Sequence, residues 1–321
     1  MNIPLINLQK LNHDLSSGTE TELQRLDHAC REIGFLALSH HKVDPALMVK
    51  MREVLQQWFA RSEANKRQLI VEQQNYRGFI PLGMFTPNQD AGLGDLYEGY
   101  KLHCEVAASD PVCEDCDLYG PNRWPEDMPV FSDTVQQYWQ EMDGIAEVLL
   151  RSFAVTLGLS AAEMLEKFAL PLTNMTLLHY PPTYEAGRVG IHPHKDSDIF
   201  TLLYPDAVGG LEVRTTQGNW IEADGPDHAL IVNVGNMLET WSGGRYLSTP
   251  HRVINRTGQK RYSFPYFVVP RHDVMIEPLV EPLPGFSWRT ISSGELSAEV
   301  WRTNWPDQLP VDPELNLGSL N

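Results

Sequence analysis

The sequence contains no apolar run close to the roughly 20 residues that a helix needs to cross a bilayer. It also lacks a basic N-terminal segment followed by an apolar stretch, so we expect no secretory signal. Positive charge is scarce, because 25 Lys and Arg stand against 42 Asp and Glu, for a formal net charge of −17. Nucleic acids and anionic membranes are bound by clustered Lys and Arg, so we expect neither as a partner.

Cysteine is also scarce. The four cysteines are Cys30, Cys104, Cys113 and Cys116. They are too few for a disulfide scaffold in a chain of this length. Cys113 and Cys116 have the spacing of a zinc or redox pair, but no second pair follows, and the acidic residues between them would raise a thiol pKa. We therefore expect four free thiols and a cytoplasmic protein.

Hydrophobic residues form 42% of the 321-residue chain, which is enough for a sizeable core. The clearest helix is expected over residues 133–157, where apolar side chains recur at three- and four-residue steps. Ser132 can cap its start and Gly158 its end. Further helices are expected over residues 20–33, 45–61 and 296–305.

Short strand-like runs separated by Gly, Pro, Asn or Asp dominate the chain from Met175 onward. They cover residues 176–180, 199–204, 211–215, 220–222, 229–234, 251–255 and 262–269. Two earlier strands are expected over residues 4–8 and 35–38. A run of short strands of this kind is typical of a sandwich or jelly roll.

Two histidines and one acid suggest a metal site. His194 and Asp196 lie at the start of a strand-like run, where alternation predicts that both point the same way. A later run supplies His251. Two imidazoles and one carboxylate are the ligand set of non-haem Fe(II) oxygenases. Zinc also accepts such a set, but the chain lacks the His-Glu-x-x-His motif of hydrolytic zinc sites.

Arg261 and Ser263 follow His251 at a distance of about ten residues and share one face of a predicted strand. A guanidinium binds a carboxylate through two parallel hydrogen bonds, and a serine hydroxyl on the same face adds a third donor. The pair therefore predicts a carboxylate-binding site.

These residues resemble the isopenicillin N synthase-like branch of the Fe(II)- and 2-oxoglutarate-dependent dioxygenases. The resemblance extends along nearly the whole chain, in order and in spacing. The matching segments are residues 3–8, 34–41, 122–125, 129–131, 180–182, 209–213 and 233–235. The chain departs from the family pattern at Lys42, where glycine is usual, and at Ser197 and Asp198, where an aromatic-glycine pair is common.

The resemblance implies a mainly β fold with flanking helices (α+β), in which helices buttress a double-stranded β-helix, or jelly-roll, core. It divides the chain into an N-terminal region (1–120), a linking region with a long helix (121–171), the oxygenase core (172–275) and a helical closure (276–321). It also implies that His194, Asp196 and His251 bind Fe(II). His192 shares a strand face with His194, but the motif places the acid two residues after the first ligand.

The family resemblance further implies that Arg261 and Ser263 bind the distal carboxylate of 2-oxoglutarate and that Tyr180 lies near this cosubstrate. The implied reaction is an oxidation of a small polar molecule, by hydroxylation, desaturation or ring closure. It consumes O2 and releases succinate and CO2, with ascorbate as an optional reductant.

The segment from Tyr76 to Tyr100 resembles the part of the family that borders the active site. It makes Tyr76, Arg77, Tyr97 and Glu98 candidates for substrate binding. Arg77 is favoured for contact with a substrate acid group, because so acidic a protein needs a local cation there. For Glu98 and Asp95, fixing the position of a loop is an equally good interpretation.

Two other functions stay open on the sequence. One is an Fe(II) oxidase of the isopenicillin N synthase or ethylene-forming type, which does not use 2-oxoglutarate. The other is a catalytically silent binding protein on the same scaffold, although such a protein would be expected to lose a metal ligand. The sequence does not decide the prime substrate or the oligomeric state.

Overall fold

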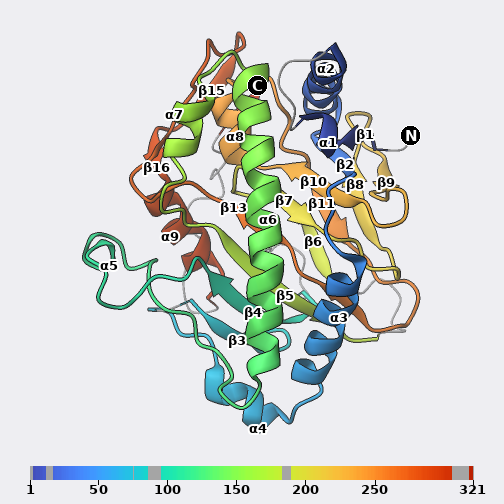
Figure 1. Cartoon of the computed structure of the whole chain (residues 1–321), viewed down its shortest axis with the longest axis vertical. Helices are drawn as coiled ribbons and strands as arrows, with labels where there is room; N and C mark the ends of the chain where they lie inside the picture. The colour runs from blue at the N-terminus through green and yellow to red at the C-terminus, as the bar shows by residue number, and fades with distance from the viewer. Residues whose placement is uncertain are drawn as a thin grey trace.

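The computed structural model describes residues 3–11, 17–74, 76–85, 95–182, 189–305 and 318–320. Within these residues, a nine-stranded sheet faces a four-stranded sheet, and helices cover the outside of the larger one (Figure 1). The large sheet has the order β1-β2-β10-β7-β13-β5-β4-β3, with β12 also paired to β5, and the small sheet has the order β6-β11-β8-β9. This arrangement is the predicted double-stranded β-helix with flanking helices.

The strands of the large sheet are β1 (Leu5–Asn7), β2 (Phe35–Ser39), β3 (Gly78–Ile80), β4 (Glu98–His103), β5 (Asn174–Tyr180), β7 (Phe200–Leu203), β10 (Leu230–Val234), β12 (Arg261–Ser263) and β13 (Tyr266–Val268). Those of the small sheet are β6 (Ile191–His194), β8 (Leu211–Arg214), β9 (Trp220–Glu222) and β11 (His251–Val253). Two further pairs join β14 (Met275–Ile276) to β16 (Ile291–Ser292) and β15 (Phe286–Trp288) to β17 (Gly318–Leu320).

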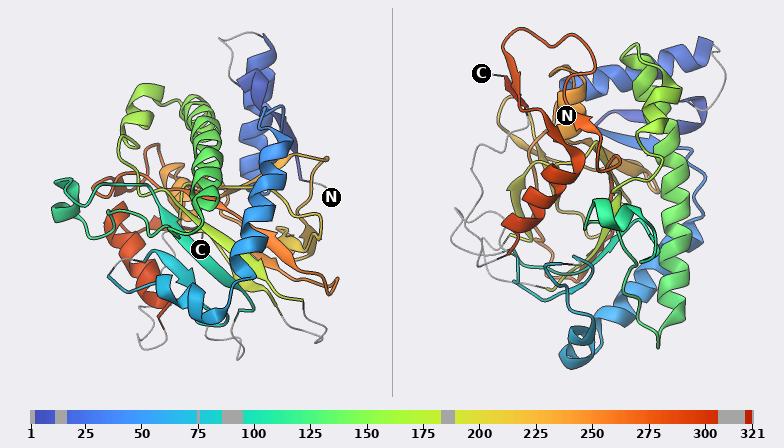
Figure 2. Two further views of the ribbon diagram at one scale, coloured as in Figure 1. Left: turned by 60° about the horizontal axis from the view of Figure 1, so that its bottom comes forward. Right: turned by 90° about the vertical axis from the view of Figure 1, so that its left-hand side faces the viewer.

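The α-helices are α1 (Leu8–Leu11), α2 (Ser17–Glu32), α3 (Pro45–Phe59), α4 (Glu63–Lys66), α5 (Val112–Asp115), α6 (Pro129–Thr156), α7 (Ala161–Glu166), α8 (Asn236–Trp241) and α9 (Ser293–Thr303), and residues Arg67–Leu69 form one turn of 3-10 helix. Helix α6 runs along the large sheet, whereas α9 lies on a different side of the molecule (Figure 2). Helix α9 begins at Ser293 and not at Leu296 as expected, because Ser292 and Glu295 form a capping box at its start.

Helix α6 buries the apolar stripe that the sequence predicts, and each fully buried apolar side chain contributes roughly 1.5–3 kcal/mol. The buried positions include Val135, Tyr138, Met142, Ile145, Leu149 and Phe153. The predicted start was wrong. The helix begins at Pro129, which is well suited to a first helical position, and the Ser132 hydroxyl donates to the Pro129 carbonyl instead of capping. Gly158 follows the helix with φ +72°, as expected for a terminating glycine.

The predicted strand over residues 262–269 is two strands. They are separated at Phe264 and Pro265, because proline cannot donate a ladder hydrogen bond. The separation lets β12 pair with the C-terminal half of β5 while β13 bridges β5 and β7. The inner face of the sheet is thereby built from both segments.

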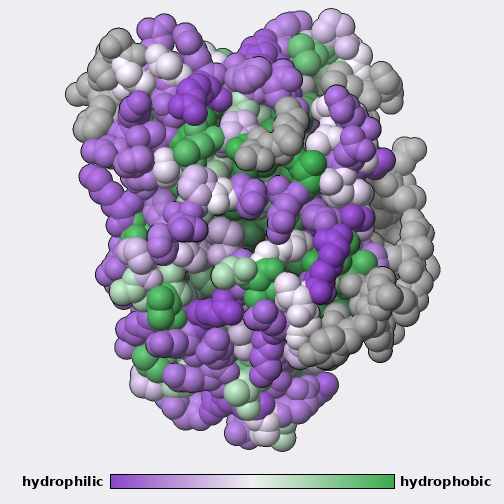
Figure 3. All heavy atoms as spheres, turned by 90° about the vertical axis from the view of Figure 1, so that its right-hand side faces the viewer, coloured by the Kyte–Doolittle hydropathy of each residue, from purple (hydrophilic) through white to green (hydrophobic). Residues whose placement is uncertain are grey.

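The described residues form two main apolar cores and a third, small cluster that includes Tyr76 and Phe85. The larger lies between the outer face of the large sheet and helices α3 and α6, where Trp58, Phe131 and Leu177 are almost completely buried. The smaller lies between the two sheets and includes Tyr180, Val213 and Ile231. On the face shown in Figure 3, hydrophilic residues predominate and hydrophobic ones form small scattered groups. Among the described residues, no helix is both long and apolar enough to cross a membrane.

The four cysteines are free, as predicted. Thiol titration of the unreduced, denatured protein should therefore count all four. In the native protein Cys30 should resist alkylation, because it is fully buried and burial raises the pKa of its thiol well above the usual value. A count of two in the denatured protein would reveal a disulfide and contradict this expectation.

Candidate metal centre and cosubstrate site

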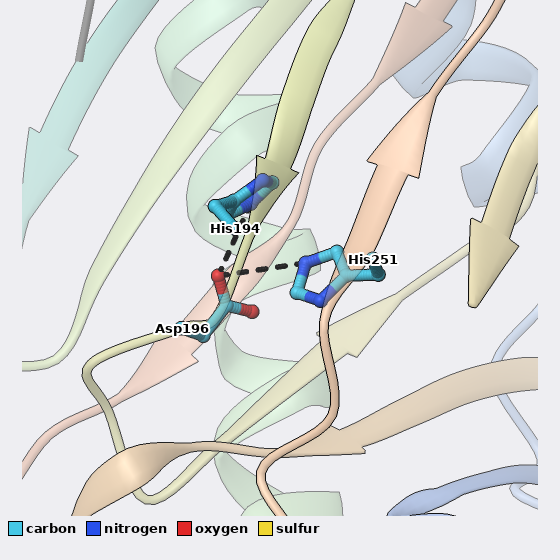
Figure 4. A group of neighbouring side chains, drawn as sticks. All are labelled: His194, Asp196 and His251. Carbon is cyan, nitrogen blue, oxygen red and sulfur yellow. Dashed lines mark ion pairs between the residues drawn. The ribbon is translucent and has the colours of Figure 1, made fainter. Parts of the chain in front are cut away.

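The structure brings the three predicted metal ligands together (Figure 4). His194 ends β6 and His251 begins β11, and the two residues are direct partners in the antiparallel pairing of these strands. Oδ1 of Asp196 lies 3.6 Å from Nε2 of His194 and 3.7 Å from Nε2 of His251. One ligand atom from each of the three residues lies within 4.8 Å of the others. This spacing fits a single metal ion with one face left open.

The predicted reason for this convergence was wrong. His194 and Asp196 are not on one strand, because β6 belongs to the small sheet and the next strand, β7, belongs to the large one. Asp196 lies on the connection between them. Its other oxygen, Oδ2, accepts hydrogen bonds from Thr201 Oγ1 at 2.5 Å and from Asn233 Nδ2 at 2.8 Å. These two donors occupy Oδ2, which leaves Oδ1 directed at the histidines.

Hydrogen bonds also fix the orientation of both imidazoles. Nδ1 of His194 lies 2.8 Å from the carbonyl of His192, and Nδ1 of His251 lies 3.2 Å from the carbonyl of Thr249. A carbonyl can only accept, so each Nδ1 carries the proton and each Nε2 presents a lone pair to a metal. His192, the competing histidine, instead bonds through its ring to Asp95, at 2.6 Å.

The electrostatics favour the metal-binding protonation states. Burial, reinforced by the neighbouring His194, lowers the pKa of His251 to about 4, so its imidazole is neutral at pH 7. Burial alone would raise the pKa of Asp196. The adjacent imidazoles and the hydrogen bonds from Thr201 and Asn233 outweigh burial and lower it. An ionised carboxylate and neutral imidazoles are the forms that bind metal ions.

A second polar group of the same inner face is built around Arg261. Arg261 pairs with Tyr180 across β12 and β5, and its guanidinium carbon lies 4.8 Å from the centre of the Tyr180 ring. Its Nε donates to the carbonyl of Gly209 at 2.9 Å. Its Nη1 is buried and has no hydrogen-bond partner among the described residues. Ser263, two residues further along the same strand face, is also buried.

A buried guanidinium nitrogen without a partner is costly, and a carboxylate in contact with it would remove this cost. The nearby Gly190 keeps room for the Tyr180 ring, because a Cβ at this position would lie 2.8 Å from that ring. The donor set therefore fits a carboxylate.

Comparison with known proteins gives the same family at the level of the whole chain. Residues 172–270 match the model of the 2OG-Fe(II) oxygenase superfamily, and residues 3–127 match that of the non-haem dioxygenase N-terminal region named for morphine synthesis. The 2-oxoglutarate-dependent dioxygenase thnC of Trichoderma harzianum is 32% identical, over 82% of this chain and 83% of that protein. The chain belongs to the 2OG-Fe(II) oxygenase superfamily.

Other relatives of this oxygenase agree. Homoarginine-6-hydroxylase 2-ODD-C23 of Glycine max is 30% identical over 80% of each chain. The solved structure of JOX2 with 2OG, Fe and JA superimposes with a TM-score of 0.77 at 26% identity, over 94% of this chain and 85% of that one. A Neurospora crassa protein solved with alpha-KG and thymine has the same fold, with a TM-score of 0.79 over 93% of this chain and 96% of that one, at 24% identity. The oxygenase therefore uses Fe(II), 2-oxoglutarate and O2, as predicted.

The structure gives other partners to two residues expected to bind substrate. Glu98 bonds to Lys66 and His179 on the sheet face opposite to Tyr180, because adjacent strand residues alternate. This arrangement favours the alternative interpretation, in which Glu98 fixes its segment. Arg77 is buried, and its Nη2 donates to the carbonyl of Leu118 at 2.8 Å. Direct contact of Arg77 with a substrate stays a prediction.

The other two candidates are aromatic. The ring of Tyr76 stacks on Trp301 of α9, with centroids 4.6 Å apart. The ring of Tyr97 lies 6.3 Å from that of Tyr180. Contact of Tyr76 or Tyr97 with a substrate stays a prediction. Residues 86–94 of the same segment lie outside the described residues.

Sequence reasoning did not single out Thr201 or Asn233, which hold Asp196 in place. Asn233 lies in the Asn-Val-Gly segment that resembles the family, which was a usable signal. No local sequence pattern indicated Thr201, because its hydrogen bond to Asp196 forms only where the chain crosses from one sheet to the other.

We expect the Thr201→Val variant of the oxygenase to bind metal roughly 10- to 100-fold more weakly, because Asp196 loses one of its two orienting donors. Anaerobic titration with Fe(II) or Co(II) would measure this change. Thr201→Ser keeps the hydroxyl and serves as the matched control. Equal affinity in the valine variant and the wild type would show that this hydrogen bond does not position the carboxylate.

Proposed function

We propose that His194, Asp196 and His251 bind the Fe(II) ion of this oxygenase, and that Arg261, Ser263 and Tyr180 bind 2-oxoglutarate. The observation that carries the proposal is the convergence of two imidazoles and one carboxylate within 4.8 Å. The unpartnered Nη1 of Arg261 supports the cosubstrate half of the assignment.

When bound, Fe(II) together with 2-oxoglutarate and O2 supplies the oxidation of a substrate C–H bond, coupled to release of succinate and CO2. The residues of the chain have positioning roles. Thr201 and Asn233 hold Asp196 so that one oxygen faces the metal position. Arg261 and Ser263 anchor the distal carboxylate, so that the keto-acid end is presented to the same place. The aromatic residues around Tyr76 exclude water from the open side.

We propose a small polar molecule as prime substrate, bound between the barrel mouth and the segment from Tyr76 to Tyr100. The small molecules associated with relatives support this class: thymine is bound by the Neurospora protein, JA is bound by JOX2, and homoarginine appears in the name of the soybean enzyme. The negative charge of the chain supports the further proposal that nucleic acids and membranes are not partners. Four free thiols support a cytoplasmic location.

We also propose that the four sequence regions are parts of a single oxygenase domain. The N-terminal region (1–120) contributes β1 and β2, which extend the large sheet next to β10 of the core (172–275). The linking region (121–171) contributes α6, and the closure (276–321) contributes α9. Because a shared sheet crosses the region boundaries, none of these regions is expected to fold alone.

We expect His194→Ala, Asp196→Ala and His251→Ala each to abolish turnover and metal binding while leaving the fold largely intact. Each substitution removes one bond to the metal and no core side chain. Succinate formation from labelled 2-oxoglutarate measures turnover, and circular dichroism measures the fold. Full activity of Asp196→Ala without an added ligand would refute the metal assignment.

We expect Arg261→Ala to raise the concentration of 2-oxoglutarate needed for half-maximal activity far more than that of the prime substrate. The lost charge-assisted pair is worth about 2–4 kcal/mol, since a buried carboxylate is left unpaired. Arg214→Ala, on the exposed side of β8, removes the same charge elsewhere and should change neither value.

The outcome of the Arg261→Ala experiment also separates the two iron-dependent functions. Loss of prime-substrate affinity alone, with no succinate formed by the wild type, would favour an oxidase that does not use 2-oxoglutarate. Succinate formation that depends on Arg261 would favour the assignment made above.

A further inference from the structure

A lysine that has no role in the proposed metal or cosubstrate sites is buried inside the barrel. Lys101, on β4, is 7% exposed, and its Nζ donates to Asn174 Oδ1 at 2.6 Å and to Thr176 Oγ1 at 3.0 Å. Both acceptors are neutral. No carboxylate of the described residues lies within ion-pair distance of Nζ, whereas the other lysine buried to this degree, Lys66, is paired with Glu98. A buried ammonium without a counter-charge is costly.

Strand register places Lys101 on the inner face with the metal site. Lys101 pairs with Thr176, Asn174 pairs with Phe267, and Phe267 pairs with Thr201, which holds Asp196. Opposite residues of paired strands share a face, and neighbouring strands lie about 4.8 Å apart. Nζ of Lys101 also lies 5.2 Å from the centre of the Phe267 ring. Two strands, β5 and β13, therefore lie between β4, which carries Lys101, and β7, which supports the Asp196 carboxylate, and the Lys101 side chain reaches across the first of them.

Two residues beside this ammonium are accessible to solvent. Thr176 and Phe267 lie on interior strands of the sheet, yet both are partly exposed, unlike their flanking residues. The ring of Tyr76, whose centre is 5.7 Å from Nζ, stacks on Trp301 of α9. The ammonium thus lies next to two partly exposed residues and next to the aromatic rings of Phe267 and Tyr76.

The bound cofactors do not balance this charge. Two positive charges of Fe(II) and one of Arg261 match one negative charge of Asp196 and two of 2-oxoglutarate. The remaining buried acid of this face, Asp198, hydrogen-bonds to Thr201 and forms no ion pair with Lys101, so no carboxylate of the described residues is in contact with the ammonium. Burial lowers the pKa of Lys101 to about 7, so an adjacent anion would favour its charged form.

The hydrogen bonds of the ammonium leave one donor for a ligand. An ammonium has three N–H donors, and Asn174 and Thr176 accept two of them. The neighbouring His103 is not a second cation, because burial and the nearby charges of Arg77 and Lys101 hold its pKa well below the usual value.

We propose that Lys101 binds the prime substrate through a single carboxylate group on that substrate. The inference rests on the proposed function, since it places the substrate beside the metal and 2-oxoglutarate. One cation with one remaining donor suits a monoanion, whereas a phosphate dianion would need further donors. The need for a local cation, which the sequence placed at Arg77, is met here by Lys101, because Arg77 donates to the Leu118 carbonyl.

The test follows the Lys101 side chain directly by NMR, in protein labelled with 13C at the lysine ε-carbon. The protein is loaded with Zn(II), which supports no turnover, and saturated with 2-oxoglutarate. Lys101→Met identifies the Lys101 signal by its loss, and Lys101→Gln does so if the methionine variant does not fold. The probes are formate, acetate and benzoate, and the neutral controls are acetamide and benzamide.

We expect at least one carboxylate to shift the Lys101 signal saturably, at a concentration at least tenfold lower than any effect on the exposed Lys50, while the amides leave it in place. Lys50→Met should not alter this response. The proposal is overturned if none of the carboxylates shifts the Lys101 signal. The proposal is also overturned if 2-oxoglutarate alone shifts the Lys101 signal and the carboxylate probes cause no further shift.

Failure of the proposed function gives a different result in the same samples. If Zn(II) and 2-oxoglutarate do not bind, as measured by calorimetry, the metal and cosubstrate assignments are wrong whatever the Lys101 signal does. If Zn(II) and 2-oxoglutarate both bind and no carboxylate shifts the Lys101 signal, only the inference about the substrate is wrong.

Discussion

The site depends on one buried carboxylate that is held from two sides. Asp196 lies on the connection between the two sheets, and both of its oxygens are used: Oδ2 by Thr201 and Asn233 of the large sheet, and Oδ1 by the histidines of the small sheet. A carboxylate so deeply buried is stable only with such partners. The two sheets are therefore joined at this point by polar contacts as well as by apolar packing.

Strand β5 organises the rest of the inner face. Its alternate residues place Tyr180 beside Arg261 at one end and Thr176 beside Lys101 nearer the other. The residues that alternate with these, Leu177 and His179, face outward. On that side His179 hydrogen-bonds to Glu98, which is also paired with Lys66. A single strand thus lies between the polar inner face, where we propose that ligands bind, and the cluster of Glu98, Lys66 and His179, which connects α4 to the barrel.

The sequence was sufficient to predict the family, the succession of short strands along the chain and the residues that converge, because these follow from local spacing and motif order. It was insufficient wherever the outcome depends on pairing between distant strands. Alternation within one strand was the wrong reason for the approach of His194 and Asp196, since the chain changes sheets between His194 and Phe200. The partners of Glu98, Arg77 and Lys101 come from segments far away in the chain, so no local pattern reveals them.

The position of β2 has a consequence for how the molecule is made. This strand is synthesised early, yet its antiparallel partner is β10, and the register joins Leu36 to Val232 and Phe35 to Asn233. Asn233 is also a donor to Asp196. On the side away from β1, the early strand therefore has no partner until most of the polypeptide has left the ribosome. Such long-range pairing slows folding and prolongs the time for which an apolar strand is exposed to chaperones or to aggregation.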